Sequence, residues 1–149
     1  MIIALFQPDI PQNAGTLARL ASCLSIELHI IEPAGFALDD KRFRRAGLDY
    51  LDRAAVVTHA GWGDFQAFCA AQGLRIVLLT TKAEQSYLDF KFSKNDALLF
   101  GRESAGVPEK IHAAAQARLR IPMRDDARSL NLALAAAMVV GEALRQINL

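Results

Sequence analysis

The sequence predicts an α/β fold, in which a mostly parallel sheet carries helices on both of its faces. Short runs of Leu and β-branched residues alternate with longer segments of helical pattern, and most of the short runs are apolar at every position. Strands of this kind are typical of a parallel sheet that helices cover on both sides. The 149 residues suffice for one compact core, so we expect a single domain over residues 1–149.

Six short runs are expected to form the strands, because each is rich in Leu or β-branched residues and most are apolar at every position. They are Ile2–Phe6, Leu28–Ile31, Ala55–Thr58, Arg75–Thr80, Ala97–Phe100 and Leu119–Ile121. Three of the intervening segments have the length and apolar spacing of helices. They are Asn13–Leu24, Trp62–Gln72 and Pro108–Ala117.

The last element, Ser129–Ile147, is predicted to be a helix that is apolar on almost every side from Leu130 to Val140. The apolar run is too short for a membrane span, because a bilayer requires roughly 20 such residues. The helix must instead be covered by protein on several faces. Since a domain of this size covers only part of it, we expect a second copy of the chain to share its surface.

The first residues and the cysteines indicate the compartment. Met1–Phe6 is apolar, but no basic region precedes it and a polar turn follows at once, so it makes a poor signal peptide. Cys23 and Cys69 lie in separate helical patterns and suggest neither a disulfide framework nor a zinc site. We therefore expect a cytosolic protein.

The net charge and the positions of the histidines do not indicate a particular ligand. The formal net charge is +1, which neither demands nor excludes a nucleic acid, because phosphate binding depends on a local patch. His29, His59 and His112 have no ligand spacing, so no metal site is expected.

Residues 8–19 follow the first strand, open the first helix and form the first candidate segment for function. Asn13 is expected to be the N-cap, which leaves nearby backbone N–H groups facing an anion, and Arg19 falls within the first two turns. This arrangement suits a phosphate. The competing interpretation is an ordinary capped junction with a solvated arginine.

Residues 98–109 form the second candidate, which is a strand, a loop bounded by Gly101 and Gly106, and a helix with Pro108 near its start. The glycine spacing resembles that of a P-loop, but Val107 and Pro108 stand where Lys and Ser or Thr are required. Residues 61–66 begin like a dinucleotide fingerprint and lack its third glycine. Both nucleotide-binding interpretations are therefore rejected.

Residues 119–131 form the third candidate, with Ser129 as the expected cap of the last helix. The amide of Asn131 is expected to enter this apolar helix, where burial without partners would cost about 1–3 kcal/mol. It should therefore be hydrogen-bonded to a loop or a ligand.

Residues 39–50 form the fourth candidate, because they hold four cations within five positions, with Phe43 among them. Such a stretch is a credible contact for RNA phosphates, although three aspartates dilute its charge. The competing interpretation is a solvated charged face.

Taken in order, three segments resemble the motifs of SPOUT methyltransferases, namely PQNAGTLAR, LLFGRESAGVP and RIPMRDDARSLNLALAAAMVV. The stretch IEPAGFALDDKRFRRAGLDY between the first two is similar to the YibK/TrmL group, whose minimal members carry no appended RNA-binding domain. The resemblance spans the chain. It implies a deep trefoil knot in which the C-terminal chain is threaded through a loop, a topology that periodicity would never predict.

The resemblance also implies S-adenosylmethionine as the cofactor, S-adenosylhomocysteine as its product, and no metal. Six residues match the positions that line the adenine slot, namely Leu79, Gly101, Ile121, Met123, Ser129 and Leu130. Apolar side chains suit the faces of the ring, backbone groups suit its polar edge, and Gly101 permits close approach.

The activity implied is methylation of the ribose 2′-hydroxyl of the tRNA wobble nucleotide, position 34, with cytidine or a modified uridine as the base. Arg19 matches an arginine regarded as catalytic, sometimes as a base. Because a neutral arginine at pH 7 costs roughly 7 kcal/mol, we expect charged Arg19 to anchor a phosphate and stabilise the developing alkoxide. A phosphate oxygen, water or Glu103 then receives the proton. Methylation of another tRNA or rRNA ribose, and a non-catalytic RNA-binding role, are the alternatives left open.

A homodimer through the knot and the C-terminal helix would place basic residues of one copy beside the cofactor slot of the other, where the tRNA anticodon loop binds. The expected RNA contacts are Asn13, Arg19, Arg42, Arg45 and Asn131. Two positions depart from the pattern of many relatives. Arg102 stands in place of Pro and is expected to add a phosphate contact, and Gly141 stands where Tyr is common.

Overall fold

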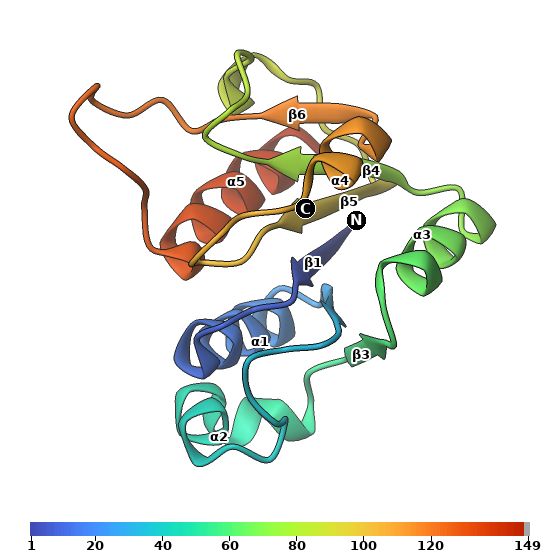
Figure 1. The fold of residues 1–149 in the computed structure, drawn as a ribbon. Helices are drawn as coiled ribbons and strands as arrows, with labels where there is room; N and C mark the ends of the chain where they lie inside the picture. The colour runs from blue at the N-terminus through green and yellow to red at the C-terminus, as the bar shows by residue number, and fades with distance from the viewer. Residues whose placement is uncertain (148–149) are drawn as a thin grey trace.

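Six strands form one parallel sheet in the computed structural model, which describes residues 1–147 (Figure 1). They are β1 (Ile2–Phe6), β2 (Glu27–Ile31), β3 (Val56–His59), β4 (Arg75–Leu79), β5 (Asp96–Phe100) and β6 (Ala117–Leu119). Their order across the sheet is β3-β2-β1-β5-β4-β6, and every pair of neighbours is parallel. The predicted α/β class with a parallel sheet is confirmed.

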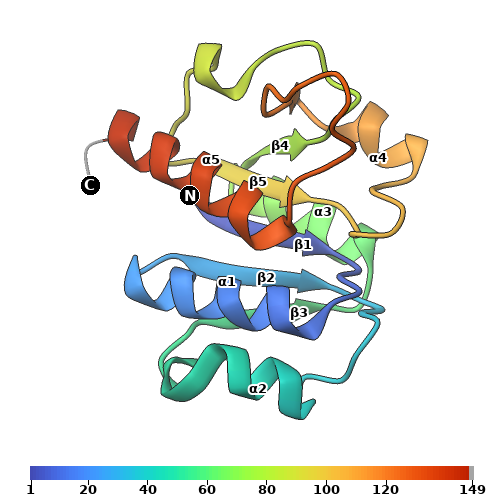
Figure 2. The ribbon, with the colours of Figure 1, turned by 90° about the vertical axis from the view of Figure 1, so that its left-hand side faces the viewer.

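Helices cover both faces of the sheet, as predicted (Figure 2). One face carries α1 (Pro11–Cys23) and α5 (Leu132–Ile147), and the other carries α3 (Trp62–Ala71) and α4 (Glu109–Ala114). The short helix α2 (Lys41–Gly47) packs against α1. Two 3-10 helices, η1 (Leu48–Asp52) and η2 (Tyr87–Asp89), lie in the connections.

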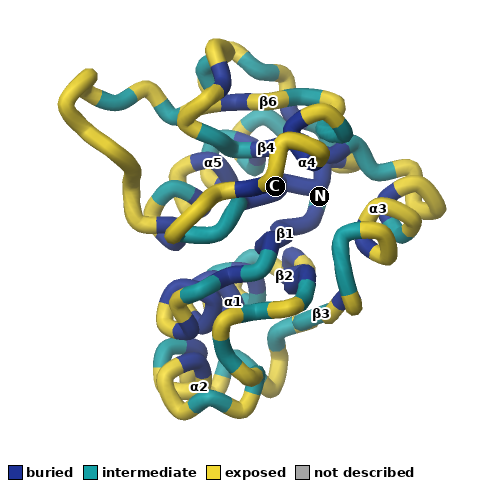
Figure 3. The backbone as a smooth tube through the Cα atoms, in the orientation of Figure 1, coloured by how far each residue is buried: buried dark blue, intermediate teal, exposed yellow. Residues whose placement is uncertain are grey.

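The central strands are buried on both sides, which explains why their sequences are apolar throughout (Figure 3). Along β1, Ile3 and Leu5 join the core under α1 and α5, whereas Ala4 and Phe6 join the core under α3 and α4. Strands β1 and β5 pair with Leu5 opposite Phe100. Both strands therefore end at the same edge of the sheet, where their following loops meet.

The first helix begins earlier than predicted. It starts at Pro11, and the preceding Ile10 occupies the N-cap position without a side-chain cap. Proline suits the first helical position because its φ is already helical, and because a backbone N–H at this position would have no acceptor within the helix. The prediction that Asn13 is the cap is wrong, since Asn13 lies in the first turn with 7% of its surface exposed.

The last helix begins later than predicted. The side-chain oxygen of Asn131 accepts hydrogen bonds from the backbone N–H groups of Ala133 (2.9 Å) and Leu134 (3.2 Å), so Asn131 is the cap of α5. The prediction of Ser129 as the cap is wrong, because this residue lies in the exposed loop before the helix. The Asn131 residue is exposed rather than buried, although its amide is hydrogen-bonded as expected.

Two other elements differ from the prediction. Strand β6 covers Ala117–Leu119, two residues earlier than expected, and Arg120 instead forms a bridge with Ser86. The basic stretch folds as helix α2, whose N-cap Asp40 accepts a hydrogen bond from the backbone N–H of Arg42 at 2.7 Å. Phe43 of this helix turns inward and is buried.

Two expectations about the whole chain stay predictions. One is the trefoil knot that the resemblance implies, and the other is a single domain over residues 1–149, whose last two residues lie outside the described part. Within residues 1–147, no helix combines the length and apolarity needed to cross a membrane.

A buried histidine pair joins strands β2 and β3. Nδ1 of His29 lies 2.8 Å from Nε2 of His59, and Nε2 of His29 lies 3.1 Å from a carboxylate oxygen of Glu27. Because the Glu27 carboxylate accepts, Nε2 of His29 carries the hydrogen, Nδ1 of His29 accepts, and His59 donates. Burial lowers the pKa of both imidazoles, although Glu27 and Asp64 oppose the shift at His29 and His59 respectively.

The histidine pair predicts a protein that loses stability as the pH falls. Below the usual imidazole pKa of 6.5, the unfolded chain takes up protons that the folded pair binds less readily, so the free energy of unfolding falls between about pH 7 and pH 5. Denaturant unfolding at a series of pH values checks this. The double variant His29→Leu, His59→Leu should show a flatter profile over the same window, and an equally steep profile in that variant would contradict the assignment.

Candidate functional site

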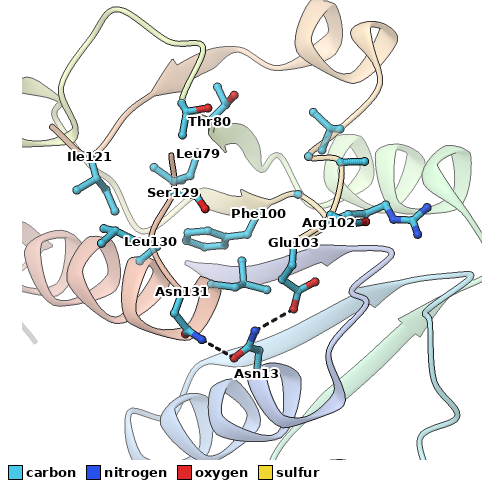
Figure 4. Close-up of a pocket in the computed structure, with 18 of the residues that line it drawn as sticks. Asn13, Leu79, Thr80, Phe100, Arg102, Glu103, Ile121, Ser129, Leu130 and Asn131 are labelled. Carbon is cyan, nitrogen blue, oxygen red and sulfur yellow. Dashed lines mark hydrogen bonds between the residues drawn. The ribbon is translucent and has the colours of Figure 1, made fainter. Parts of the chain in front are cut away.

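A pocket of about 440 Å³ opens at the carboxyl ends of β4 and β5 (Figure 4). From β1 the chain continues to β2 and β3 on one side, whereas β5, β4 and β6 lie on the other side. Ligands of open α/β sheets bind beyond the carboxyl ends of the strands where the order reverses in this way. The volume falls in the usual range for small-molecule sites.

All six residues predicted for the adenine slot line this pocket. They are Leu79, Gly101, Ile121, Met123, Ser129 and Leu130. Several lining residues were not predicted, namely Ile10, Leu78, Thr80, Thr81, Phe100, Val107, Arg128 and Ala135. Thr80 and Thr81 could have been found, because Thr80 ends a predicted strand and Thr81 directly follows it, at the end where ligands bind.

The loop after β5 is closed on itself by two backbone hydrogen bonds. The N–H of Arg102 donates to the carbonyl of Gly106 at 3.0 Å, and the N–H of Gly106 donates to the carbonyl of Arg102 at 2.8 Å. A Cβ on Gly101 would lie 2.7 Å from the carbonyl carbon of Gly106, and Gly106 itself has a φ of +64°. Both glycines are therefore required by the shape of this wall of the pocket.

Replacing Gly101 with alanine should open this loop. The added Cβ meets backbone rather than a flexible side chain, so the substitution should cost about 1–3 kcal/mol of stability and weaken binding in the pocket by about 10-fold or more. Denaturant unfolding and calorimetric titration of S-adenosylhomocysteine measure the two effects. Gly63→Ala is the matched control, because a Cβ at this helical position meets nothing within 4 Å. Equal affinities for the two variants would refute the steric argument.

Three polar side chains from three separate segments form a chain of hydrogen bonds at one side of the pocket (Figure 4). Nδ2 of Asn131 donates to Oδ1 of Asn13 at 2.9 Å, and Nδ2 of Asn13 donates to Oε1 of Glu103 at 3.1 Å. The other oxygen of Glu103 accepts from the backbone N–H of Asp9 at 2.8 Å. The structure thus brings together Asn13, Glu103 and Asn131, which had been assigned from distant parts of the sequence.

The direction of each hydrogen bond in this chain is fixed by the start of α5. The Asn131 oxygen must accept, because two helical N–H groups point at it, so its NH₂ group faces Asn13. The Asn13 oxygen is then occupied, and its NH₂ group faces Glu103. Both oxygens of Glu103 consequently meet N–H donors, an arrangement that suits a carboxylate acting as acceptor only.

Arg102 lines the pocket beside Glu103 and pairs with Asp9 from the loop after β1. Its Nη2 lies 2.7 Å from Oδ1 of Asp9. Hydrogen bonding to Arg102 lowers the pKa of Asp9, and the same contact raises the pKa of Arg102. The guanidinium that was expected to contact a phosphate is therefore bound within the chain.

Arg19 is not among the residues that line the pocket. It lies six residues beyond Asn13 on α1, which displaces it by about 9 Å along the helix and turns it by roughly 240° around the axis. Its guanidinium carbon lies 5.1 Å from the centre of the Tyr50 ring, and the residue is exposed. One chain alone therefore does not bring Arg19 to Asn13 and Glu103.

The basic residues of α2 lie on the exposed surface next to α1 and also do not line the pocket. Arg42 forms an ion pair with Asp40 at 2.8 Å, and hydrogen bonding to Arg42 lowers the pKa of Asp40 to about 2. Lys41, Arg44 and Arg45 belong to the same helix, and within residues 1–147 no ion pair joins them to an acid. Arg44 is therefore a further candidate for contact with RNA, beside Arg45, although it was not among the RNA contacts expected from the sequence.

In the described part of the chain, no group of three or more His, Cys, Asp or Glu side chains could hold a metal ion. The polar groups that line the pocket are amides, hydroxyls, one carboxylate, the guanidinium groups of Arg102 and Arg128, and backbone groups. These groups can orient an organic ligand and can hold or accept a proton at Glu103.

Comparison with known proteins identifies the family. The model of the SpoU rRNA Methylase family matches residues 1–141. A tRNA (cytidine(34)-2'-O)-methyltransferase of Beijerinckia indica subsp. indica is 59% identical over 146 residues, which cover 98% of this chain and 91% of the relative.

Two solved structures share the fold. One, described as "Structural insights into the 2-OH methylation of C/U34 on tRNA", has a TM-score of 0.92 at 41% identity and covers 97% of this chain and 93% of that chain. The SpoU methyltransferase AviRb from Streptomyces viridochromogenes, in complex with the cofactor AdoMet, has a TM-score of 0.90 at 26% identity, covering 98% of this chain and 60% of that chain. These matches confirm the resemblance to SPOUT methyltransferases, and the extent of the family match shows that the chain belongs to the SpoU rRNA Methylase family.

Proposed function

We propose that this chain is an S-adenosylmethionine-dependent methyltransferase that acts on the ribose 2′-hydroxyl of the tRNA wobble nucleotide. The target is position 34, with cytidine or a modified uridine as the base, and the enzyme works in the cytosol with its tRNA. One observation carries the proposal: three distant segments converge on a pocket with an apolar slot at one side and Asn13, Glu103 and Asn131 at the other. The relative that is 59% identical is a tRNA (cytidine(34)-2'-O)-methyltransferase, which supports the choice of substrate.

The residues of the pocket fit an adenosyl cofactor. Leu79, Ile121 and Leu130 offer apolar contact to an adenine ring, while Gly101 and Gly106 allow the tight loop that forms one wall of the pocket. When bound, S-adenosylmethionine supplies an activated methyl group that needs no metal. The chain's own residues position the ribose 2′-hydroxyl for transfer of the methyl group and accept the proton that the hydroxyl loses.

We assign two roles to charged or ionisable groups. Two N–H donors hold Glu103 at the pocket, and its carboxylate oxygens keep further lone pairs, so it can accept the hydroxyl proton directly or through water. Arg19 stays charged, anchors an RNA phosphate and stabilises the developing alkoxide. Asn13 and Asn131 orient Glu103 and offer polar contacts to RNA, while Arg45 and Arg42 on α2 extend the phosphate contacts.

The position of Arg19 leads us to propose a homodimer, because one chain does not place this residue at its own pocket. Helix α5 offers a surface for the second copy: Leu134 is 63% exposed and Met138 is 44% exposed, one turn apart on the same side. Exposed apolar residues in such a stripe indicate a protein contact. A dimer through α5, and through the knot that the resemblance implies, would bring Arg19 of one copy beside the pocket of the other.

The substitution Leu134→Glu should produce a monomer. The side chain is mostly exposed in the single chain, so the charge should cost little folding stability but should disrupt an apolar interface. Light scattering coupled to size-exclusion chromatography measures the mass, and circular dichroism checks the fold. Glu84→Gln, an exposed charge change away from α5, is the control. A dimer of unchanged stability in Leu134→Glu would show that α5 is not the interface.

Incubation with labelled S-adenosylmethionine and total tRNA tests the proposed function, followed by mass spectrometry of nuclease fragments. The expected result is a single 2′-O-methyl group at nucleotide 34. Label at another ribose would support the same reaction but identify a different target nucleotide. Binding of RNA without label, unaffected by loss of the cofactor, would instead indicate a non-catalytic RNA-binding protein.

A further inference from the structure

Asp9, in the loop after β1, is held by three consecutive residues of the loop after β5. Its Oδ1 accepts from Nε (3.2 Å) and Nη2 (2.7 Å) of Arg102. Its Oδ2 accepts from the backbone N–H (3.1 Å) and the hydroxyl (2.5 Å) of Ser104. Its own backbone N–H donates to Glu103, the residue between these two. Five hydrogen bonds therefore join a single residue to one short stretch of a facing loop.

This contact differs from an ordinary surface ion pair. The side chain of Asp9 is only 21% exposed and that of Arg102 39% exposed, whereas the Arg124–Asp126 pair in the loop before α5 is 86% and 72% exposed. All four donors to the Asp9 carboxylate lie in a loop whose ends are already joined by the Arg102–Gly106 backbone bonds. Forming charge-assisted hydrogen bonds in such a pre-formed loop costs little conformational entropy, so these bonds can fix the position of the loop.

The Asp9 contacts also fix the position of Glu103. The backbone of Glu103 is flanked on both sides by residues that grip Asp9, and its carboxylate accepts from the Asp9 backbone as well. The bond from Asn13 to Glu103 is 3.1 Å long, so a small shift of the loop would break it. The position of the Glu103 carboxylate over the pocket thus depends on the Asp9 contacts.

We propose that Asp9, Arg102 and Ser104 form a positioning clamp that holds Glu103 in place for methyl transfer. The inference rests on the proposed function and deepens it, since it assigns these residues a role in the rate of transfer without contact with the reacting atoms. Release of the clamp would let the loop tip move by a fraction of an ångström to an ångström, and misplacement of that size can cost on the order of 100-fold in rate.

A merely structural role predicts a different result. If the clamp only shaped the wall of the cofactor slot, its removal would weaken cofactor binding and leave the rate at saturating cofactor unchanged. Single-turnover transfer to tRNA at saturating labelled S-adenosylmethionine, together with calorimetric titration of S-adenosylhomocysteine, separates the two roles.

Asp9→Ala and Arg102→Ala should each lower the single-turnover rate by about 10- to 100-fold, with product affinity within about threefold of the unmodified protein. Arg102→Lys keeps the charge but loses the two-nitrogen contact, so its single-turnover rate should lie between that of the unmodified protein and that of Arg102→Ala. The double variant Asp9→Ala, Arg102→Ala should be no slower than Asp9→Ala alone, because both changes release the same clamp. Asp126→Ala, which removes the acid of the exposed pair, is the matched control and should keep its rate.

Hydrogen–deuterium exchange gives a readout that does not depend on RNA or activity. In Asp9→Ala, amides of residues 101–107 should exchange faster, while those of β1 and α3 stay unchanged. Unchanged exchange in this loop, or an unchanged single-turnover rate, would overturn the clamp. If the unmodified protein methylates no RNA, the proposed function fails, and the exchange result alone then decides whether Asp9 holds the loop.

Discussion

Replacing Arg19 with alanine should lower the rate of methyl transfer by about 100- to 1,000-fold while leaving the affinity for the cofactor unchanged. The residue is exposed on α1 and does not line the pocket of its own chain, so its loss should not disturb that pocket. The proposed role predicts this large effect, because the variant would lose the positive charge that stabilises the negative charge developing on the ribose oxygen. Single-turnover transfer and calorimetric titration of S-adenosylhomocysteine measure the two quantities.

Arg19→Lys separates the electrostatic role from a role as base. A lysine keeps the charge, so part of the activity should survive with the same pH optimum. If activity survives with its optimum moved to lower pH, as expected for a base that titrates at lower pH, the electrostatic role is wrong. Tyr50→Phe keeps the aromatic ring under the guanidinium and should retain activity, whereas Tyr50→Leu should lose part of it.

Mixed dimers test whether Arg19 serves the pocket of the second copy. Arg19→Ala and Glu103→Ala should each be inactive alone. After unfolding and refolding of an equal mixture, about half of the dimers contain one of each, and each of these has one intact site if Arg19 acts across the interface. About a quarter of the unmodified activity should therefore return. No recovery would show that Arg19 and Glu103 of the same chain work together.

The second large effect is expected for Glu103→Gln. In either orientation of the new amide, its NH₂ group faces a donor, either the backbone N–H of Asp9 or the NH₂ group of Asn13. Asn13 cannot turn, because Asn131 is fixed by the N–H groups at the start of α5. The variant should lose about 1–3 kcal/mol of stability and at least about 100-fold in rate.

A second substitution can restore the hydrogen bonds without restoring the carboxylate at position 103. When Glu103→Gln is combined with Asn13→Asp, the new carboxylate at position 13 accepts from both the new amide at position 103 and Asn131, and the net charge is unchanged. The new acid lies in the first turn of α1, where negative charge is favourable. Stability should return, as measured by denaturant unfolding, while the rate of transfer stays low. Recovery of the rate as well would show that Glu103 does not itself accept the proton.

The sheet could be predicted from the local pattern of the sequence, whereas the six predicted pocket residues came from the resemblance to SPOUT methyltransferases. β1 and β5 are buried on both sides, so their residues are almost all apolar and the strands stand out. Those six residues belong to or lie beside the motifs that carry the resemblance, and the fold brings them to one pocket. The ends of the helices were harder to predict, because several residues near each end are good caps by type. Pro11 starts α1 two residues before Asn13, and Asn131 rather than Ser129 caps α5.

Contacts between distant segments were beyond the reach of pattern analysis. Asp9 and Arg102 are 93 residues apart, and nothing in their local sequence indicates that they pair. Helix α2 was not predicted, because the stretch was considered only as a charged surface, although Asp40 before it is a typical cap. The homodimer proposed above would decide which pocket Arg19 serves, and a contact between two copies leaves no local pattern in the sequence.

Calorimetric titration of the purified protein with S-adenosylhomocysteine is the most direct test, because every role proposed for the pocket requires an adenosyl ligand within it. We predict one saturable site per chain, lost or weakened by about 10-fold or more in Gly101→Ala and retained in Arg19→Ala. Absence of binding by the unmodified protein, for both S-adenosylhomocysteine and S-adenosylmethionine, would contradict the proposed role of the pocket.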